Sequence, residues 1–330
     1  METKQAPQPL PPPPSVTPAI KAGMDAISVH LSILLLPLGL DLLLWFGPRL
    51  SIQPLFASLL EQMKSFGVGG AMKASDVEAA QQMLTEWLSR FNLLSVLRTF
   101  PVGVSSLMTA KQPAVNPLGG GSVVEVHSGV GLIGWLFLLT VLGWVAGGLY
   151  FHWVSKATGS RETNFGGGRA VTQTVLFSVL LAVAAFMVGM PVMFVVGIVG
   201  LISPNLLQIL LFILALFSAW IVVPVFFSAH GIFLRGQNAF YSIYAGLRMA
   251  RFTLPSSSMF VLAVFVISQG LNYLWAIPAD NSWMLLVGMA GHAFVTTALL
   301  AASFIYYHDM NAWLELVFQR LKPDATAQQT

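Results

Sequence analysis

The sequence contains no cysteine and few charged residues. The lack of cysteine excludes disulfides, iron–sulfur clusters, thiolate metal sites and thiol nucleophiles, but it leaves the redox compartment open. Only 9% of the 330 residues are charged, against about 25% in an ordinary soluble domain, so a soluble fold would have too little polar surface. The net charge of +3 is small, and we therefore expect no nucleic-acid partner.

The motifs of membrane-bound enzymes are missing as well. We find no serine elbow, paired aspartates, zinc-binding His–Glu pair, or acyltransferase or phosphatase pattern. His308 and Asp309 are too short a signal for chemistry, and we interpret them as a cap at the end of the last helix. The glycine run at 166–168 has no preceding strand and no following Lys-Ser/Thr pair, so we interpret it as a loop. We predict no catalytic residues, no metal and no other cofactor.

The sequence does contain six long apolar segments. Hydrophobic residues make up 56% of the chain, and each segment is close to the ~20 residues that a helix needs to cross a bilayer. This pattern predicts an all-α fold, in the form of a polytopic membrane protein with six transmembrane helices. The predicted spans are residues 27–46, 130–153, 175–201, 206–230, 257–277 and 283–307.

The two ends of the chain have a different composition. Residues 1–25 are polar and proline-rich, and they lack the basic start and short apolar core of a secretory signal. The proline run at 10–14 favours polyproline II, which could dock in an aromatic-lined groove, but we favour a solvated tether. We predict a disordered cytoplasmic tail at 1–25, a transmembrane domain at 26–322 and a disordered tail at 323–330.

Basic residues in the loops predict the orientation. The loops after the second and fourth spans are basic, while the turns at 203–205 and 278–281 contain no lysine or arginine. Short basic loops stay in the cytoplasm, so six spans place both termini on the cytoplasmic side of a plasma (inner) membrane. The basic residues of the two loops are Lys156, Arg161, Arg169, Arg235, Arg248 and Arg251.

The segment 48–129 between the first two spans is predicted to be an insertion outside the membrane. It holds six basic residues, contrary to the positive-inside rule, but its ~80 residues exceed the ~60 over which the rule is reliable. Apolar residues recur at three- and four-residue steps over 52–66, which predicts an amphipathic helix. The members of this stripe are Ile52, Leu55, Phe56, Leu59, Met63 and Phe66.

A second amphipathic helix is predicted to follow the glycine break at 67–70. Ser75 and Glu78 form a capping box at its start, and we expect Pro101 to end it before a loop at 101–121. The two outer helices could pack on each other, cap the bundle, lie among lipid headgroups or receive a partner. We favour packing within the chain.

Asp41 is the one carboxylate well inside a predicted span. An ionisable group in hydrocarbon costs at least ~2.5 kcal/mol, so it usually faces a cavity, a partner or a pathway. Asp41 could therefore be a proton or cation ligand on a transport path. We favour the structural alternative, in which Asp41 caps backbone groups near Pro37 or pairs with a polar group of a neighbouring helix.

The last two predicted spans share a polar stripe. Gln269 and Asn272 lie three residues apart on one helix face, His292 and Thr296 lie four apart on the other, and an antiparallel pair could bring them together. Hydrogen bonds between membrane helices contribute only ~0.6 to 2 kcal/mol, so a structural role accounts for the stripe, with ligand binding as the alternative. Together with Asp41, these residues form a candidate intramembrane polar site.

Four further histidines map to the cytoplasmic ends of the predicted spans. A shared depth would suit a haem or metal site, but their spacing forms no ligand motif, and imidazole is readily accommodated at a headgroup boundary. We therefore expect no metal there. The four are His30, His152, His230 and His308.

Membrane lipids are the expected partners. Gly143 and Gly147 have the small-xxx-small spacing that lets helices approach closely, either within the bundle or between protomers. A protein partner or self-association through these glycines or through the outer helices is the second expectation.

The stretch from about 224 to 267 resembles a known family. Residues 235–243 and 247–252, with their Ala-x-x-Ser pattern and basic positions, are similar to the in-plane helix of the bacterial six-helix family that includes the YciC-like proteins and the membrane domain attached to some glycerophosphodiester phosphodiesterases. The resemblance implies six helices with an in-plane helix after the fourth span, and no catalytic residues. The insertion at 48–129 departs from this family.

The residues of the same stretch also predict contact with lipid. Phe240, Ile243, Tyr244 and Leu247 share one helix face. We predict a non-enzymatic membrane component that organises or regulates partners or envelope lipids. The alternative is a transporter or lipid-handling permease that uses Asp41 and the polar stripe. The residues predicted to contact lipid headgroups are Arg235, Arg248 and Arg251.

Overall fold

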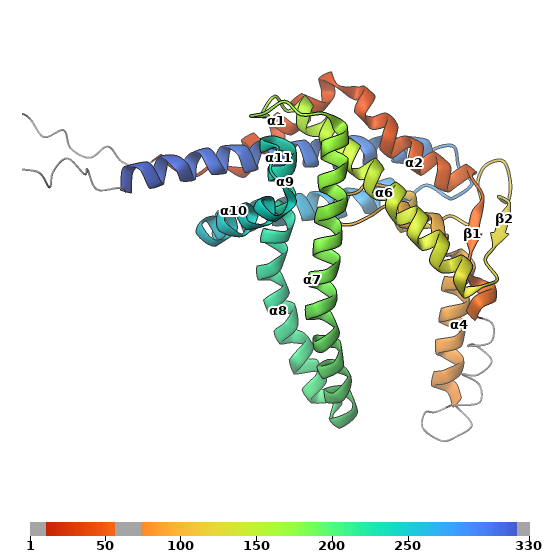
Figure 1. The fold of residues 1–330 in the computed structure, drawn as a ribbon. Helices are drawn as coiled ribbons and strands as arrows, with labels where there is room; N and C mark the ends of the chain where they lie inside the picture. Colours follow the sequence, from red (N-terminus) through yellow and green to blue (C-terminus); the bar gives the residue numbers. More distant parts are fainter. Residues whose placement is uncertain (1–10, 57–73, 322–330) are drawn as a thin grey trace, which may run out of the picture. The chain divides into compact units, whose positions relative to one another are not determined.

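The computed structural model describes residues 11–56 and 74–321, and nearly all of that part of the chain is helical (Figure 1). The prediction of an all-α fold is confirmed at this level. The helices, in chain order, are α1 (Val16–Val29), the 3-10 helix η1 (Leu31–Leu34), α2 (Leu35–Phe46), α4 (Ala74–Arg90), the 3-10 helix η2 (Leu93–Leu97), α5 (Met108–Lys111), α6 (Gly129–Ala157), α7 (Gly167–Ile202), α8 (Pro204–Ser228), α9 (His230–Arg235), α10 (Ala239–Trp275) and α11 (Leu285–Leu321). Two short strands, β1 (Arg49–Ser51) and β2 (Val123–Glu125), pair in parallel.

Five of the described helices are long and apolar enough to cross a membrane, and a bent pair at the start of the chain would make a sixth. The five are Gly129–Ala157, Gly167–Ile202, Pro204–Arg235, Ala239–Trp275 and Leu285–Leu321. They contain the second to sixth predicted spans, apart from one or two residues at the ends. The membrane class of the protein is thus supported by helix length and composition.

The first predicted span, 27–46, is not one straight helix. The backbone leaves the helical region at His30, with φ −121° and ψ 48°, and its N–H bonds to Ile27 O at 3.0 Å, which ends α1. A 3-10 turn then leads into α2. The bent pair therefore replaces the simple span that we predicted.

Residues 16–25 are helical, so the predicted disordered tail at 1–25 is wrong for this part. Ala19, Gly23 and Ile27 recur at four-residue steps and are buried on one face of α1. A Cβ at Gly23 would lie 2.4 Å from Ala298 O, so the glycine lets α1 pack directly on the α11 backbone. Residues 1–10 and 322–330, which include most of the predicted tails, lie outside the described residues.

The chain divides into two compact units, which we describe separately. The first contains residues 11–30, 154–266 and 298–321, and the second contains 31–56, 74–153 and 267–297. Three of the long helices, α6, α10 and α11, contribute residues to both.

The second unit includes most of the insertion. β1 pairs with β2 with Leu50 opposite Val124, and the Leu50 N–H donates to Asn92 Oδ1 at 3.0 Å. These strands pack with the predicted second outer helix, α4, which ends at Arg90 rather than near Pro101. The first outer helix falls largely on residues 57–73, outside the described part of the chain. The buried apolar residues of this region are Leu50, Ile52, Leu88, Leu93, Val126 and Leu139.

The part of the insertion predicted as a loop is packed into the second unit. Lys111 Nζ donates to the carbonyls of Ala276 and Pro278 at 2.9 and 3.0 Å, just beyond the C-terminal end of α10, and pairs with Asp280 at 3.0 Å. A cation at this helix end is stabilised by the unpaired carbonyls and the helix dipole. Met108 lies with Trp45 in a second apolar cluster. The stretch predicted as a loop is therefore held by polar and apolar contacts of the second unit.

Gly143 and Gly147 of α6 also contact the insertion. A Cβ at Gly143 would lie 2.6 Å from Leu97 O, and one at Gly147 would lie 2.7 Å from Gly103 Cα. The small residues do allow a close approach, but the partner is the end of η2 and the irregular segment after it, not another long helix. This face is filled by the chain itself.

In the first unit, α7 and α8 lie side by side as a long hairpin (Figure 1). Large apolar side chains point outward along both helices; Phe186 is 64% exposed and Phe212 is 65% exposed. A helix that is apolar on all sides requires an apolar environment, and the length and composition of both helices are those of membrane spans.

Helix α10 consists of two segments that meet at Thr253. The backbone of Thr253 is not helical, with φ −125° and ψ 18°, and Pro255 follows two residues later. The Thr253 hydroxyl donates to Met249 O at 2.8 Å and lies 2.8 Å from Ser257 Oγ, which satisfies polar groups at the kink. We call residues 239–252 the interfacial segment. Its in-plane placement stays a prediction.

Candidate functional site

The interfacial segment has a buried face of small residues. Ser242 Oγ donates to Ser228 O at 2.6 Å, and a Cβ at Gly246 would lie 2.7 Å from Ser228 Cα. Met249 and Ala250 are buried on the same side. The small side chains let this segment pack closely against the end of α8. The opposite face of the segment is exposed.

The outward face carries aromatic rings and two cations. Tyr244 is 59% exposed and Leu247 is 52% exposed, and Arg248 and Arg251 are exposed beside them. The Arg248 guanidinium lies 5.4 Å from the centre of the Phe318 ring, within range of a cation–π contact. This mixture of rings and arginines is typical of a helix at a lipid–water boundary.

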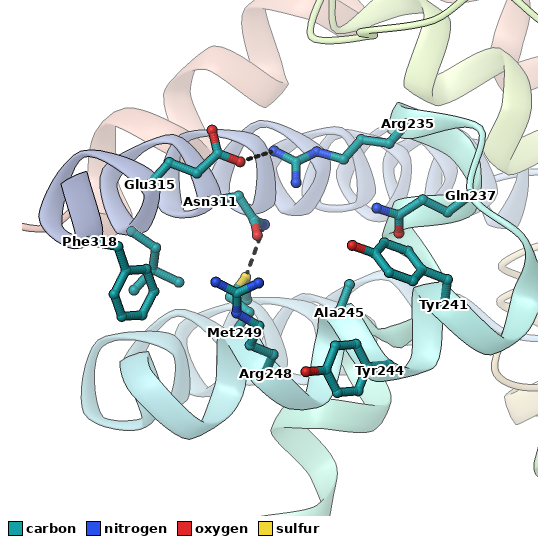
Figure 2. A pocket seen from close by; sticks show the side chains of 11 residues that line it. Arg235, Gln237, Tyr241, Tyr244, Ala245, Arg248, Met249, Asn311, Glu315 and Phe318 are labelled. Atoms are coloured by element: carbon teal, nitrogen blue, oxygen red, sulfur yellow. Dashed lines mark hydrogen bonds and ion pairs between the residues drawn. The ribbon is translucent and has the colours of Figure 1, made fainter. Parts of the chain in front are cut away.

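A polar hollow lies between the interfacial segment and the last turns of α11. Figure 2 shows lining side chains from both helices, with Arg235 and Gln237 at one end and Phe318 at the other. Asn311 Nδ2 bonds to Tyr307 O at 2.7 Å and lies 3.4 Å from Met249 Sδ, so this amide is held between the helices. The lining residues are Arg235, Gln237, Tyr241, Tyr244, Ala245, Arg248, Met249, Asn311, Leu314, Glu315 and Phe318.

A second hollow, which we call the apolar groove, lies beside the first. It is lined by Tyr244, Leu247, Arg248, Arg251, Phe252 and Phe318. The rings of Phe252 and Phe318 meet edge to face with centroids 5.2 Å apart. Three residues, Tyr244, Arg248 and Phe318, line both hollows. The two hollows are therefore neighbours, with Arg248 at the seam between them.

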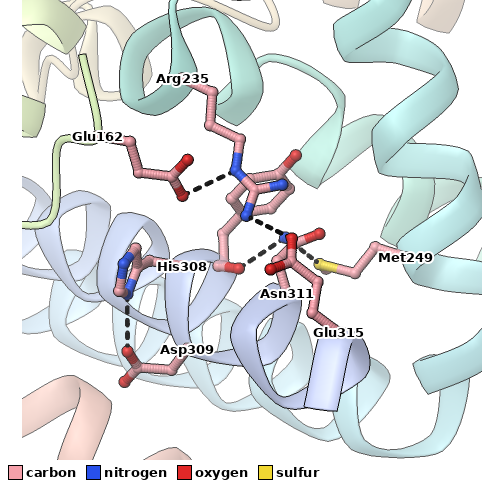
Figure 3. A network of polar contacts seen from close by, with 8 residues as sticks. Glu162, Arg235, Met249, His308, Asp309, Asn311 and Glu315 are labelled. Atoms are coloured by element: carbon pink, nitrogen blue, oxygen red, sulfur yellow. Dashed lines mark hydrogen bonds and ion pairs between the residues drawn. The ribbon is translucent and has the colours of Figure 1, made fainter. Parts of the chain in front are cut away.

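Arg235 is held in an ion-pair network of its own. Its Nε donates to Glu162 at 2.8 Å and its Nη2 to Glu315 at 3.2 Å (Figure 3). Only 21% of the Arg235 side chain is exposed. Two carboxylates therefore neutralise the charge that we predicted to meet lipid headgroups. The prediction is corrected for Arg235, because its side chain joins two loops and the last helix instead.

The loop before α7 is attached to the same region. The Arg161 Nε donates to Phe233 O at 3.3 Å, and its guanidinium lies 4.1 Å from the centre of the Phe165 ring. Partial burial lowers the pKa of Arg161, which still remains a cation at neutral pH. Arg169 Nη2 donates to Gly236 O at 2.7 Å. The two loops that we predicted to be cytoplasmic thus contact each other.

The predicted intramembrane residue Asp41 is fully buried in the second unit, where it accepts two hydrogen bonds. Ser106 Oγ donates to its Oδ1 at 2.6 Å, and the Met108 N–H donates to the same oxygen at 3.0 Å. Its Oδ2 has no hydrogen-bond partner among the described residues. Asp41 therefore caps backbone and hydroxyl groups, as in the favoured structural alternative. The groups come from the insertion rather than from the vicinity of Pro37 or a neighbouring helix.

The polar stripe of the last two spans is assembled in part. His292 Nδ1 lies 2.6 Å from Asn272 Oδ1, so these two helices do meet through the predicted pair. Thr296 Oγ1 donates to His292 O at 2.7 Å and lies 2.8 Å from Ser105 Oγ. Gln269 is exposed, and no hydrogen bond joins it to the described members of this group.

Four residues of this polar cluster were missed by the sequence reasoning. Ser105 and Ser106 connect Thr296 to Asp41, and the Tyr150 hydroxyl lies 2.7 Å from Thr297 Oγ1. Arg98 is close enough for its charge to act on both Asp41 and His292. The one feature of the sequence that could have indicated these residues is the apolar composition of the predicted loop at 101–121. Its buried members are Val102, Val104, Leu107 and Met108.

The histidines that we considered as metal ligands have other neighbours. His230 is buried among aromatic rings, and its Nε2 lies 2.8 Å from Ser303 Oγ. His308 Nδ1 lies 3.0 Å from Asp309 Oδ1, as Figure 3 shows. Over residues 11–56 and 74–321, no three histidine or acidic side chains are grouped so as to hold a metal ion.

Comparisons with known proteins identify no relative of this chain. No protein-family model matches this chain, and comparison with curated proteins and with solved structures finds no match.

Proposed function

We propose that this protein is a non-enzymatic component of a bacterial-type plasma membrane, with six spans and cytoplasmic termini, that engages anionic lipid headgroups through the interfacial segment. Organisation or regulation of envelope lipids, or of partners held there, would follow from that contact. The observation that carries the proposal is the pair Arg248 and Arg251. Within the described residues, the recorded contacts of their side chains are with aromatic rings, not with carboxylates.

The charge and position of these arginines support contact with lipid. A basic residue near an anionic membrane surface contributes about 1 kcal/mol, so two contribute enough to change which lipids are retained. The exposed rings beside them suit the headgroup layer, where an aromatic side chain has both polar and apolar surroundings. Unlike Arg235, they have no ion pair among residues 11–56 and 74–321.

Packing in the first unit supports the proposed orientation. The Glu162 N–H donates to Leu234 O at 3.0 Å, and Arg235 pairs with Glu162. The loops after the second and fourth spans are therefore adjacent, as they must be if both lie on one side of the membrane. Their excess of basic residues favours the cytoplasmic side.

The test is reconstitution of the full chain with defined lipids. We expect R248Q/R251Q to lower the preference for phosphatidylglycerol over phosphatidylcholine, measured as co-purified lipid, by roughly thirtyfold, because two contributions of about 1 kcal/mol are lost. R90Q is the matched control, since Arg90 is an exposed arginine of α4 paired with Glu86. An unchanged preference in R248Q/R251Q would refute the proposal.

A second candidate function, transport, is favoured by the polar cluster. The irregular backbone at 98–107 meets α11 at Thr296, eleven residues into that helix. Irregular backbone at membrane depth occurs where it is buried in protein or lines a water-filled path. Two buried atoms, Asp41 Oδ2 and His292 Nε2, have no hydrogen-bond partner within the described part of the chain and would face such a path.

The absence of native cysteine makes this candidate easy to test. Single cysteines at Leu40, Gln269, Asn272 and Thr296 would be challenged in intact membranes with a small, membrane-impermeant maleimide. Rapid labelling at Asn272 and Thr296 would support a water-filled path, whereas protection of both would exclude one. A cysteine at Leu118, which is 78% exposed in the insertion, is the positive control for an outer position.

A further inference from the structure

We propose that the polar hollow and the apolar groove together bind one anionic phospholipid molecule, with its phosphate at Arg248 and an acyl chain along the groove. This inference rests on the proposed function and makes it more specific. It turns a general contact between a basic helix and a lipid surface into a site with defined occupancy.

The continuity of the two hollows is the first argument. Tyr244, Arg248 and Phe318 belong to the lining of both, so a ligand that fills one reaches the other at these side chains. The first hollow has charged and amide side chains among its lining, while the second is lined by three rings, one aliphatic side chain and two arginines. A molecule that matches both must have a polar and an apolar part joined at the position of Arg248.

The positive charge of Arg248, where the two hollows meet, indicates which chemical group the polar part of the ligand carries. Arg235, at the far end of the polar hollow, is already paired with Glu162 and Glu315. Arg248 and Arg251 have ring contacts at 5.4 and 5.8 Å, which hold the guanidinium groups without neutralising them. A guanidinium binds phosphate through two parallel N–H···O bonds, so a phosphate is the matching group at Arg248.

The remaining lining of the polar hollow limits the headgroup. The Tyr241 hydroxyl and the Gln237 amide offer hydrogen bonds, while Glu315 places negative charge there (Figure 2). A headgroup with a single phosphate and neutral hydroxyl groups, such as glycerol, suits this arrangement. A second anionic group close to Glu315 would be repelled by it.

The apolar groove separates a lipid from a soluble phosphate. Leu247, Phe252 and Phe318 form its apolar surface, and a free phosphate ion would leave that surface uncovered. Where this surface meets water, covering it is favourable by about 25 cal/mol per Å², and an acyl chain would cover it. Phosphate chemistry and apolar cover together favour a phospholipid.

The experiment is native mass spectrometry of the full chain released from nanodiscs of dioleoylphosphatidylcholine that contain a small fraction of dioleoylphosphatidylglycerol. We expect one phosphatidylglycerol per chain to be retained, in preference to phosphatidylcholine by about tenfold. R248Q is expected to abolish this preference. L247W, which fills the groove from an exposed position, and L247S, which makes it polar, are both expected to lower retention several-fold, while R90Q retains the lipid.

The possible failures are distinguishable. Graded retention of several lipids without saturation at one, with the preference still dependent on Arg248 and Arg251, would overturn this inference and leave the proposed function standing. Displacement of the retained lipid by millimolar glycerol phosphate would assign the site to a soluble phosphate and would also overturn it. Equal retention of phosphatidylglycerol and phosphatidylcholine by the unmodified chain would overturn both. Melting temperatures of L247W, L247S and R248Q show whether a loss comes from unfolding.

Discussion

The interfacial segment and the polar cluster both contain arginine and hydroxyl groups, but they differ in how their charged side chains are placed. Asp41 is fully buried and bonded to Ser106 and Met108, whereas Arg248 is exposed and contacts a ring. A polar group surrounded by apolar surface must find its partners inside the chain, because none is available in hydrocarbon. A polar group at the membrane boundary can be completed by headgroups or water. An external ligand is therefore expected at the interfacial segment rather than at the polar cluster.

The largest effect is expected from removing the central acceptor of the polar cluster. Asp41→Ala leaves the Ser106 hydroxyl and the Met108 N–H without their acceptor, and each unsatisfied buried donor costs about 1–3 kcal/mol. We expect the free energy of unfolding, measured by SDS titration in mixed micelles, to fall by about 3 kcal/mol. Asp41→Asn, which keeps an acceptor oxygen, is expected to lose less.

Asp309→Ala is the control for this prediction. It removes a half-exposed carboxylate whose recorded contact is with the adjacent His308, so a change within about 0.5 kcal/mol is expected. A loss in Asp41→Ala no larger than in this control would show that Asp41 does not hold the insertion in place.

An intermediate effect is expected where the insertion packs on α6. In Gly147→Ala, the new methyl group would lie 2.7 Å from Gly103 Cα and 2.8 Å from Val102 O, and backbone must move to relieve the contact. Overpacking of this kind costs about 1–3 kcal/mol. The same micelle titration measures it.

Gly134→Ala is the matched control, because nothing lies within 4 Å of a Cβ there. Alanine is the better helix former, so this variant is expected to be as stable as the original chain or more stable. If both alanine variants behave alike, the close approach of residues 97–103 to α6 is refuted.

The smallest effect on stability is expected from a comparison of Arg235 with Arg248. Arg235→Gln breaks two partly exposed ion pairs and is expected to lower stability by about 1 kcal/mol. Because Arg235 is already neutralised, the preference for phosphatidylglycerol should not change. Arg248→Gln should show the reverse, with an altered preference and little loss of stability. A loss of lipid preference in Arg235→Gln would contradict this division of roles.

Local patterns in the sequence account for the helices and for one contact of the polar cluster. Five long apolar segments lie in helices of sufficient length, and the pairing of Asn272 with His292 follows from their positions near a tight turn between two spans. The bend at His30 was not predicted, because the apolar run continues through it and hydropathy does not register a change of backbone direction.

What the sequence determined by itself is the membrane class of the helices and the exclusion of cysteine chemistry, since both depend on composition and local spacing. The tertiary structure decided that Ser106 reaches Asp41 across 65 residues and that Gly143 and Gly147 receive the insertion. It also decided that Arg235 is paired with two carboxylates, whereas Arg248 lies against a ring. These outcomes depend on which segments pack together. Hydrophobic periodicity reports only whether a face is buried, and it does not identify the groups that cover it.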